Sequence, residues 1–292
     1  MKQEIKISFS ILFVITLAII SSCEKDITVD LPVAEQKIVV EGYIETGQKA
    51  VVTLTKSASF FAPIDSASLL SYLVLNAFVT VSNGITTDTL VLTVDNNYYI
   101  PLVYKTQNLT GQEGSTYTLT VVADGKTVTS VTTIPHAVPL DSVWFKLQEG
   151  RDTLGYAWAH LTDPDSIGNC YRWFAKRLGK DERYLPPPGS VFEDKFINGR
   201  SFDFAYNRGT EPNSNALDDD NEERGFFKIG DTIAVKFCAI DRTHFDFWRI
   251  EEVQINSNGN PFAAPARIPS NINGGLGIWG GYAVTYDTII AQ

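Results

Sequence analysis

Residues 116–133 read TYTLTVVADGKTVTSVTT. Polar and apolar side chains alternate on both sides of Asp124-Gly125, as they do in strands that bury one face. The pair Asp124-Gly125 tolerates the positive φ angles that a type I′ turn requires. The stretch therefore predicts a β-hairpin formed by Tyr117–Ala123 and Lys126–Thr133.

The same period-two pattern extends over residues 37–134 with closely spaced turn signals, among them Asn83-Gly84 as a second predicted hairpin turn. The other strands predicted there are Ile38–Ile44, Ala50–Thr55, Leu75–Ser82, Ile85–Leu92 and Tyr98–Ile100. Such a series of short strands predicts an immunoglobulin-like or transthyretin-like β-sandwich.

Two prolines within residues 135–140 interrupt the pattern and predict a linker. Residues 141–292 then predict a second β-rich domain, with a long loop at 184–220 and one short helix at 243–255, capped by Asp241 or Thr243. Its predicted strands are Ser142–Leu147, Thr153–Leu161, Cys170–Leu178, Thr232–Ile240 and Ala283–Ile290. The chain is therefore expected to be all-β.

The N-terminus carries a short apolar run, residues 7–20, which follows Lys2 and Lys6. The run is too short for a spanning helix and is typical of a signal peptide. The sequence Ser21-Ser22-Cys23 resembles a bacterial lipoprotein signal, so we expect residues 1–22 to be removed and Cys23 to be lipidated. Residues 23–36 are then the lipidated tether; the alternative is an ordinary signal with an accidental cysteine.

Two further motifs bear on export. Glu24-Lys25-Asp26 resembles the acidic signal that sends Bacteroidota lipoproteins to the outer face of the outer membrane, although a plain polar tether has a similar composition. Asp followed by Ser or Thr and an aliphatic residue or Ala resembles the O-glycosylation motif of the same bacteria. Ser66 and Ser166 are the acceptors we expect to be modified, whereas other copies mark the start of a strand after a turn.

The charge distribution argues against nucleic-acid binding, because 34 acidic residues face 24 basic ones and no basic block occurs. No motif of a nucleophile, nucleotide or metal site is present, so we expect no enzyme activity. The histidines lie in separate segments, and His244 is expected at the surface or cap of its helix. The carboxylate pairs Glu193-Asp194 and Glu251-Glu252 leave a hydrolase as an alternative.

The residues that could bind an ion or form a cross-link are few. Asp218, Asp219, Asp220 and Glu222 could bind calcium, but they lack the spacing of an EF-hand loop and are more typical of a solvated loop tip. We therefore expect no cofactor beyond the covalent lipid. Cys170 and Cys238 form a candidate disulfide, with two buried free thiols as the alternative.

The C-terminal region supplies the resemblance to a known family. Residues 259–282 are rich in Gly and Pro, residues 239–248 read AIDRTHFDFW, and residues 39–44 read VVEGYI. Together they resemble a Bacteroidota outer-membrane lipoprotein family, domain of unknown function 4249, over essentially the whole mature chain. Members are often encoded beside TonB-dependent receptors, and the resemblance carries over no catalytic or ligand-binding residue.

Aromatic residues leave two interpretations open. The Gly-rich segment at 259–281 predicts a backbone that turns repeatedly, with Trp279 and Tyr282 plugging a sheet; alternatively, Phe262 and Trp279 contact a partner. Trp158 and Trp173 alternate with small or polar neighbours, which hints at a sugar or peptide platform but is more typical of core packing.

These observations lead to one expectation with two alternatives. We expect a lipid-anchored protein on the extracellular face of the outer membrane that serves a TonB-dependent import system as a non-catalytic accessory subunit. It would dock on the receptor or its associated lipoprotein through residues 184–220 or 259–281. The alternatives are a stand-alone glycan- or peptide-binding lipoprotein or adhesin, and a hydrolase with a loop-built site.

Overall fold

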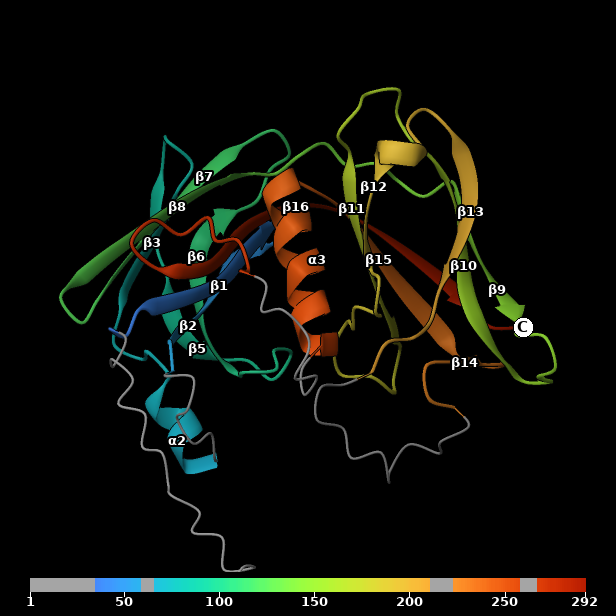
Figure 1. The fold of residues 1–292 in the computed structure, drawn as a ribbon, viewed down its shortest axis with the longest axis horizontal. Helices are drawn as coiled ribbons and strands as arrows, with labels where there is room; N and C mark the ends of the chain where they lie inside the picture. The colour runs from blue at the N-terminus through green and yellow to red at the C-terminus, as the bar shows by residue number, and fades with distance from the viewer. Residues whose placement is uncertain (1–34, 59–65, 211–222, 258–266) are drawn as a thin grey trace, which may run out of the picture. The chain divides into compact units, whose positions relative to one another are not determined.

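The computed structural model describes residues 35–58, 66–210, 223–257 and 267–292, and Figure 1 shows its fold. Among the described residues strands far outnumber helices, and the sheets form a sandwich-like arrangement. The predicted all-β class is therefore confirmed. Residues 36–292 form one compact unit.

The strands follow in chain order as β1 (Ile38–Glu45), β2 (Lys49–Lys56), β3 (Phe78–Ser82), β4 (Thr87–Thr89), β5 (Val91–Val94), β6 (Leu102–Thr110), β7 (Thr116–Ala123), β8 (Lys126–Thr133), β9 (Ser142–Leu147), β10 (Leu154–Thr162), β11 (Cys170–Arg177), β12 (Val191–Glu193), β13 (Ser201–Tyr206), β14 (Phe227–Lys228), β15 (Thr232–Ile240) and β16 (Leu276–Ile290). The helices are α2 (Ser66–Ser71), α3 (Arg242–Ser257) and the 3₁₀ helix Asp194–Phe196.

The largest sheet has eight strands in the order β12-β11-β15-β16-β1-β2-β6-β5. Strand β1 pairs in parallel with β16 near the C-terminus and antiparallel with β2. Strands from both sides of the predicted linker, residues 135–140, therefore share this sheet and join the two predicted β domains through it.

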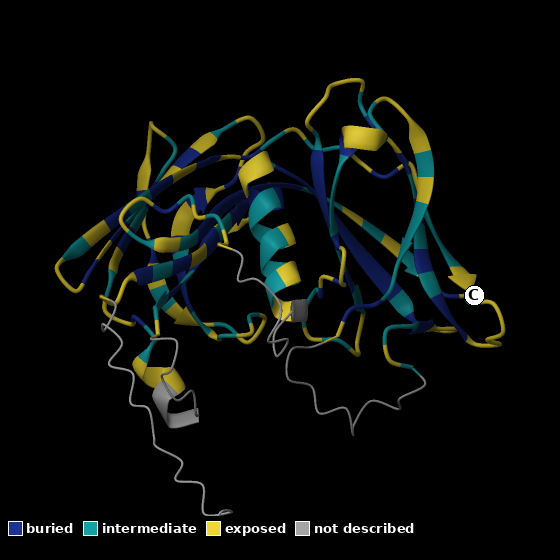
Figure 2. Ribbon diagram, viewed as in Figure 1, coloured by how far each residue is buried: buried dark blue, intermediate teal, exposed yellow. Residues whose placement is uncertain are grey.

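Two four-stranded sheets complete the sandwich. One has the order β4-β3-β7-β8, and in the other β10 pairs with β9, β13 and β14. The Nε1–H of Trp279 on β16 donates to the carbonyl of Tyr117 on β7 at 3.1 Å, and Trp173 on β11 packs edge-on against Phe204 on β13. Figure 2 shows buried residues concentrated along the central strands, where one face of the large sheet meets both smaller sheets.

The C-terminal strand corrects one prediction. Strand β16 begins at Leu276, so residues 276–282 extend along β1 instead of turning repeatedly. Their glycines permit close approach: a Cβ on Gly281 would lie 2.7 Å from the carbonyl oxygen of Thr133, and one on Gly277, whose φ is 102°, would clash with the carbonyl oxygen of Val40. Glycine is therefore required inside this strand by its neighbours.

One of the two predicted hairpin turns is confirmed, and the other has a different conformation. Asp124 and Gly125 have φ angles of 50° and 71°, so the predicted turn with positive φ at both positions is confirmed. At the other turn only Gly84 has positive φ. The side-chain oxygen of Asn83 instead accepts the backbone N–H groups of Ile85 and Thr86, which lengthens the connection to residues 83–86.

Two further predictions were wrong in position. Residues 98–100 are not a strand, and the strand in this region is β6, which begins at Leu102. The predicted loop at 184–220 contains β12, the 3₁₀ helix and β13, because its polar residues alternate with Phe192, Phe202 and Phe204 that pack together. Residues 211–222 lie outside the described part.

The predicted helix is present as α3, and its cap is Asp241. The Asp241 carboxylate accepts the backbone N–H of His244 at 2.9 Å, as a capping residue does. The expectation of a surface His244 was wrong, because the side chain is fully buried and its Nε2 donates to the carbonyl of Trp279 at 2.8 Å. Within the described residues, no helix has both the length and the hydrophobicity needed to cross a bilayer.

The candidate disulfide is not formed. Cys170 and Cys238 are free thiols in one small buried cluster, the second of the two interpretations. Cys170 lies opposite Ile240 and Cys238 opposite Arg172, so the two thiols are diagonal neighbours on β11 and β15. Diagonal positions are too far apart for ready bridging. Burial raises the pKa of both thiols to about 12.

Candidate functional site

A cavity of about 890 Å³ lies on the face of the eight-stranded sheet that is turned away from the main core. Strands β1, β11, β15 and β16 supply its floor, and α3 supplies one wall; Figure 1 shows α3 across this part of the sheet. Residues 97–99 and 182–188 line its remaining sides. The volume lies within the range typical of small-molecule sites.

The alternation of the strands explains the composition of the floor. On β11, Tyr171 and Trp173 enter the main core, whereas Arg172, Phe174 and Lys176 line the cavity. The other floor strands alternate in the same way, because successive side chains of a strand point to opposite faces. Their cavity-facing residues are Glu41, Tyr43 and Glu45 on β1, Lys236 on β15, and Tyr282 and Tyr286 on β16.

Arg172 is held between the floor and the helix. Its guanidinium carbon lies 3.6 Å from the centre of the Trp248 ring and 4.7 Å from that of Phe174. The Trp248 Nε1–H donates to the hydroxyl of Tyr282 at 3.0 Å, which fixes the indole. Although Arg172 is only 7% exposed, its Nε has no hydrogen-bond partner within the described residues.

Of the five glutamates that line the cavity, Glu41 and Glu251 are the two whose pKa the charge of Arg172 lowers. Burial raises the pKa of Glu41 and of Glu251, and the charge of Arg172 only partly offsets this effect. The negative charge of Glu41 also contributes to the rise in the pKa of Glu251. Clefts that combine desolvation with charged neighbours are typical of functional sites.

Tyrosine rings make up much of the apolar surface. The Tyr43 ring lies 6.5 Å from that of Tyr98 and 5.7 Å from that of Tyr282, and Tyr184 and Tyr286 form a second group with centroids 6.0 Å apart. Burial raises the pKa of Tyr43 well above its ordinary value, so this hydroxyl stays neutral near neutral pH. The cavity therefore offers aromatic faces next to neutral hydroxyl groups.

A buried ion pair crosses the floor between β15 and β1. The Lys236 Nζ contacts the Glu45 carboxylate closely, and both side chains are almost fully buried. Burial alone would lower the pKa of Lys236, but the charge and hydrogen bond of Glu45, together with smaller contributions from Cys238 and Tyr286, raise the pKa above its ordinary value. Because each charge is already compensated, this pair serves to hold the floor together.

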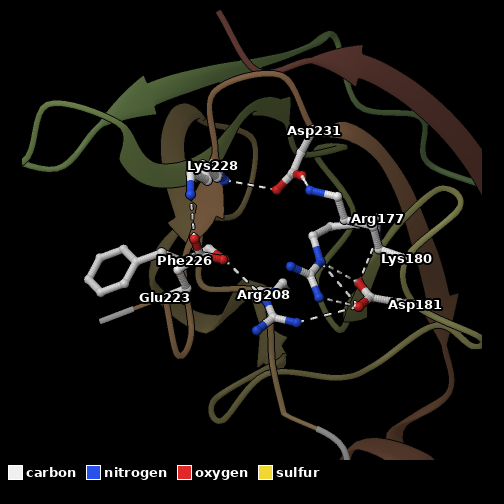
Figure 3. Close-up of polar contacts among 8 residues, drawn as sticks. All are labelled: Arg177, Lys180, Asp181, Arg208, Glu223, Phe226, Lys228 and Asp231. Atoms are coloured by element: carbon white, nitrogen blue, oxygen red, sulfur yellow. Dashed lines mark hydrogen bonds and ion pairs between the residues drawn. The ribbon is translucent and has the colours of Figure 1, made fainter. Parts of the chain in front are cut away.

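A polar network precedes the cavity-lining segment 182–188 in the chain, and Figure 3 shows its contacts. The Asp181 carboxylate accepts hydrogen bonds from the backbone and guanidinium of Arg177 at 2.7 Å and contacts Arg208 at 3.4 Å. Lys180 pairs with Asp231 at 2.6 Å. This network ties the turn after β11 to β13 and β15, and so fixes the start of the cavity-lining segment 182–188.

Several predicted site residues lie outside the described residues, namely Cys23, Asp218, Asp219, Asp220, Glu222 and Phe262. Among the predicted acceptors, Ser66 begins α2 and Ser166 is exposed between β10 and β11; modification of either stays a prediction. Trp279 is fully buried and packs inside the sandwich, as the first interpretation predicted, so the alternative of a partner contact through this ring was wrong.

The residues considered for catalysis are mostly dispersed. His160 on β10 pairs with Asp203 on β13 at 2.6 Å, whereas the buried His244 lies on α3. In the pair Glu193-Asp194, Glu193 contacts Arg242 and Asp194 accepts the backbone N–H groups at Gly168 and Asn169, so both serve structure. Within the described ranges, no group of three or more His, Cys, Asp or Glu residues could hold a metal ion.

The second predicted carboxylate pair does reach the cavity. Glu252 is tied to the rim, because it accepts the backbone N–H of Gly189 in a short hydrogen bond, whereas Glu251 faces the cavity near Arg172. Of the two tryptophans singled out, Trp173 belongs to the core. Trp158 is half-buried on the small sheet, where it stacks on Trp144 with centroids 6.2 Å apart.

Sequence reasoning missed the floor of the cavity, including Glu41, Tyr43 and Arg172. The alternation of residues along the floor strands was interpreted as one buried face and one face in contact with solvent. A signal was present, since the solvated face of a strand such as β7 carries Thr116, Thr118 and Thr120, whereas the corresponding positions of β1 and β11 carry carboxylates, rings and an arginine. Large amphipathic residues at those positions indicate that another part of the protein covers this face of the strand.

Fold and cavity together define a β-sandwich protein with a cavity suited to a small ligand. The model of the family described as "Domain of unknown function (DUF4249)" matches residues 24–288, so the chain belongs to this family. A search of curated proteins gave no match. The family is thus the one that the sequence resembles, while lipidation, membrane location and association with TonB-dependent receptors stay predictions.

Proposed function

We propose that this protein is a surface-exposed outer-membrane lipoprotein that serves a TonB-dependent nutrient import system as a non-catalytic binding subunit. The observation that carries the binding role is the cavity beneath α3, with Arg172 stacked on Trp248 and two carboxylates nearby. The lipoprotein-like N-terminus and the family resemblance support the location and the partner. The cavity would hold a nutrient before it passes to the receptor.

The non-catalytic character rests on the dispersal of reactive groups. Near the cavity the acidic candidates are Glu41 and Glu251, and burial raises the pKa of both. An inverting or retaining glycosidase needs one carboxylic acid and one carboxylate, with environments that push their pKa values apart. Two groups raised by the same cause fit binding better than acid–base chemistry.

The test is affinity purification of the lipidated protein from detergent-solubilised outer membranes, followed by mass spectrometry. A Cys23→Ala variant serves as the control for membrane anchoring. Recovery of a TonB-dependent receptor in stoichiometric amount with the lipidated protein is the expected result. Recovery of the lipoprotein alone, after chemical cross-linking in intact cells as well, would rule out the accessory role.

A second candidate is a stand-alone ligand-binding lipoprotein or adhesin for glycans or peptides. One observation favours it: this chain supplies both the floor and the helical wall of a cavity large enough for a small ligand. The same purification separates the two candidates, because a stand-alone protein binds its ligand in solution but brings down no receptor.

A further inference from the structure

We propose that the cavity binds a neutral carbohydrate, with hydroxyl groups that bridge Arg172 to Glu41 and Glu251. The inference rests on the proposed function and names the ligand class of the same site. It starts from polar groups that the protein leaves without partners. The Arg172 Nε is a buried donor with no acceptor, and neither carboxylate has a hydrogen bond or ion pair within the described residues.

Arg172 offers an unpaired hydrogen-bond donor, and Glu41 and Glu251 offer acceptors in the same cavity. Such a combination favours a ligand that carries hydroxyl groups. A hydroxyl donates one hydrogen bond and accepts others, so a pair of neighbouring hydroxyls can donate to a carboxylate and accept from a guanidinium at once. Leaving a buried donor such as the Arg172 Nε unpaired costs free energy, which a ligand that accepts its hydrogen bond recovers. Sugars carry hydroxyls on adjacent carbons and match this arrangement.

Charged ligands fit less well. An anion placed against Arg172 would also meet Glu41 and Glu251, whereas a cation placed against the carboxylates would meet Arg172. Because like charges repel, each choice loses part of the electrostatic attraction that it gains. A neutral polyhydroxylated ligand avoids this repulsion.

The aromatic rings supply the other half of sugar recognition. A pyranose ring presents a face of C–H groups, which packs on the face of an aromatic ring. The Tyr43 group and the Tyr184 group both border Lys236, whose Nζ lies 5.9 Å from the ring centroids of Tyr43 and of Tyr184. Two ring groups separated by one polar residue suit a short oligosaccharide, and the cavity volume of about 890 Å³ has room for one.

The position of Arg172 also favours recognition of a fixed geometry. Stacking on Trp248 holds the guanidinium plane, and the indole is itself held by Tyr282. A donor fork that is already immobilised loses little rotamer freedom on binding, which improves affinity. A lysine at this position would keep the charge but lose the planar fork.

The experiment is isothermal titration calorimetry of the full soluble chain with three sets of probes. Cellobiose, maltose and xylobiose are the neutral probes; digalacturonic acid and the disaccharide of glucosamine are the charged ones; dialanine and dityrosine are the peptides. We expect saturable binding of at least one neutral disaccharide and at least tenfold weaker binding of every charged or peptide probe.

Matched variants tie the binding to the cavity. Arg172→Lys and Glu251→Gln should each weaken binding of the neutral sugar at least tenfold. Arg249→Lys makes the same change on the exposed surface of α3 and should leave affinity within a factor of two. Since Glu251 sits on the helix surface toward the cavity, its variant keeps the test valid even if Arg172→Lys fails to fold.

The outcomes separate the ligand class from the binding role. Tighter binding of a charged probe or a peptide, lost in Arg172→Lys, would overturn the carbohydrate assignment and leave the proposed binding function intact. Binding of no probe would overturn the carbohydrate assignment, while the receptor purification would still decide the proposed function. Cleavage of a bound disaccharide would overturn the non-catalytic part of that function.

Discussion

The guanidinium carbon of Arg172 on β11 lies 3.6 Å from the centre of the Trp248 ring on α3. This cation–π contact joins the floor of the cavity to the helix that covers it, and such contacts contribute about 0.5–2 kcal/mol. The contact leaves the Nε of Arg172 without a partner, so the arginine is placed better for a ligand than for the stability of the empty protein. The first prediction follows from that difference.

Replacing Arg172 by Met should separate stability from binding. A buried charge without an ion pair is costly, and an apolar residue of similar length is often neutral or stabilising in such a place. We expect the free energy of unfolding in urea to be unchanged within about 1 kcal/mol or to rise, while ligand affinity is lost. A loss of several kcal/mol would show instead that Arg172 is mainly structural.

Replacing Lys236 by Met should instead lower the free energy of unfolding. Lys236→Met leaves Glu45 buried and uncompensated, which costs about 3–5 kcal/mol. The double variant Glu45→Leu/Lys236→Met removes both charges and should recover most of that loss. Chemical denaturation of the three proteins measures it; a single variant as stable as the parent would contradict the assignment of this pair to the floor of the cavity.

Glycines in β16 provide a test of close packing. Gly277 has a φ of 102° and faces the backbone of Val40, whereas Gly230 has a φ of 94° with nothing within 4 Å of a Cβ. Gly230→Ala should cost about 1–3 kcal/mol from backbone strain alone. Gly277→Ala should cost a further amount of about 1–3 kcal/mol from overpacking. If thermal unfolding shows the same loss of stability in both variants, the backbone of Val40 must shift to accommodate the new Cβ at position 277.

The contrast between these glycines shows what the sequence could predict. The hairpin at Asp124-Gly125, the strand at 126–133 and the helix over 243–255 were predictable, because local turn and cap chemistry determines them. The strand from Leu276 was not, since its glycines are selected by the backbones of β1 and β8, which are distant in sequence. Local propensity would place a loop there.

The cavity was beyond prediction for a related reason. Period-two alternation indicates that a strand has two different faces but does not indicate what covers the second one. The capped start of α3 was predictable at Asp241. Its placement over Tyr282 and Arg172 depends on tertiary contacts of Trp248, which no local pattern in residues 243–255 encodes.

Asp181 should make stability depend on acidity. Burial would raise the pKa of Asp181, but the hydrogen bonds from Arg177 and the charges of Arg177 and Arg208 hold the pKa below its ordinary value. Its stabilisation is therefore complete above the unfolded-state pKa, about 3.9, and is lost as the pH falls through the lower folded-state pKa.

Asp181→Asn tests this directly. At pH 7 the variant should be less stable by about 1.5–3 kcal/mol, because Arg177 loses hydrogen bonds to a charged acceptor. The two proteins should converge in stability as the pH falls through the lowered folded-state pKa of Asp181, where the parent carboxylate is also protonated. A difference that persists unchanged to low pH would mean that the charge of Asp181 does not contribute.

The central claim is that the ligand occupies the cavity between α3 and the eight-stranded sheet. The most direct measurement is a crystal structure of the protein with a bound disaccharide from the calorimetric panel. We predict sugar density within hydrogen-bond distance of Arg172 and Glu251, packed on the Tyr43 ring. Density on the stacked Trp144 and Trp158 of the small sheet, with the cavity empty, would contradict the account.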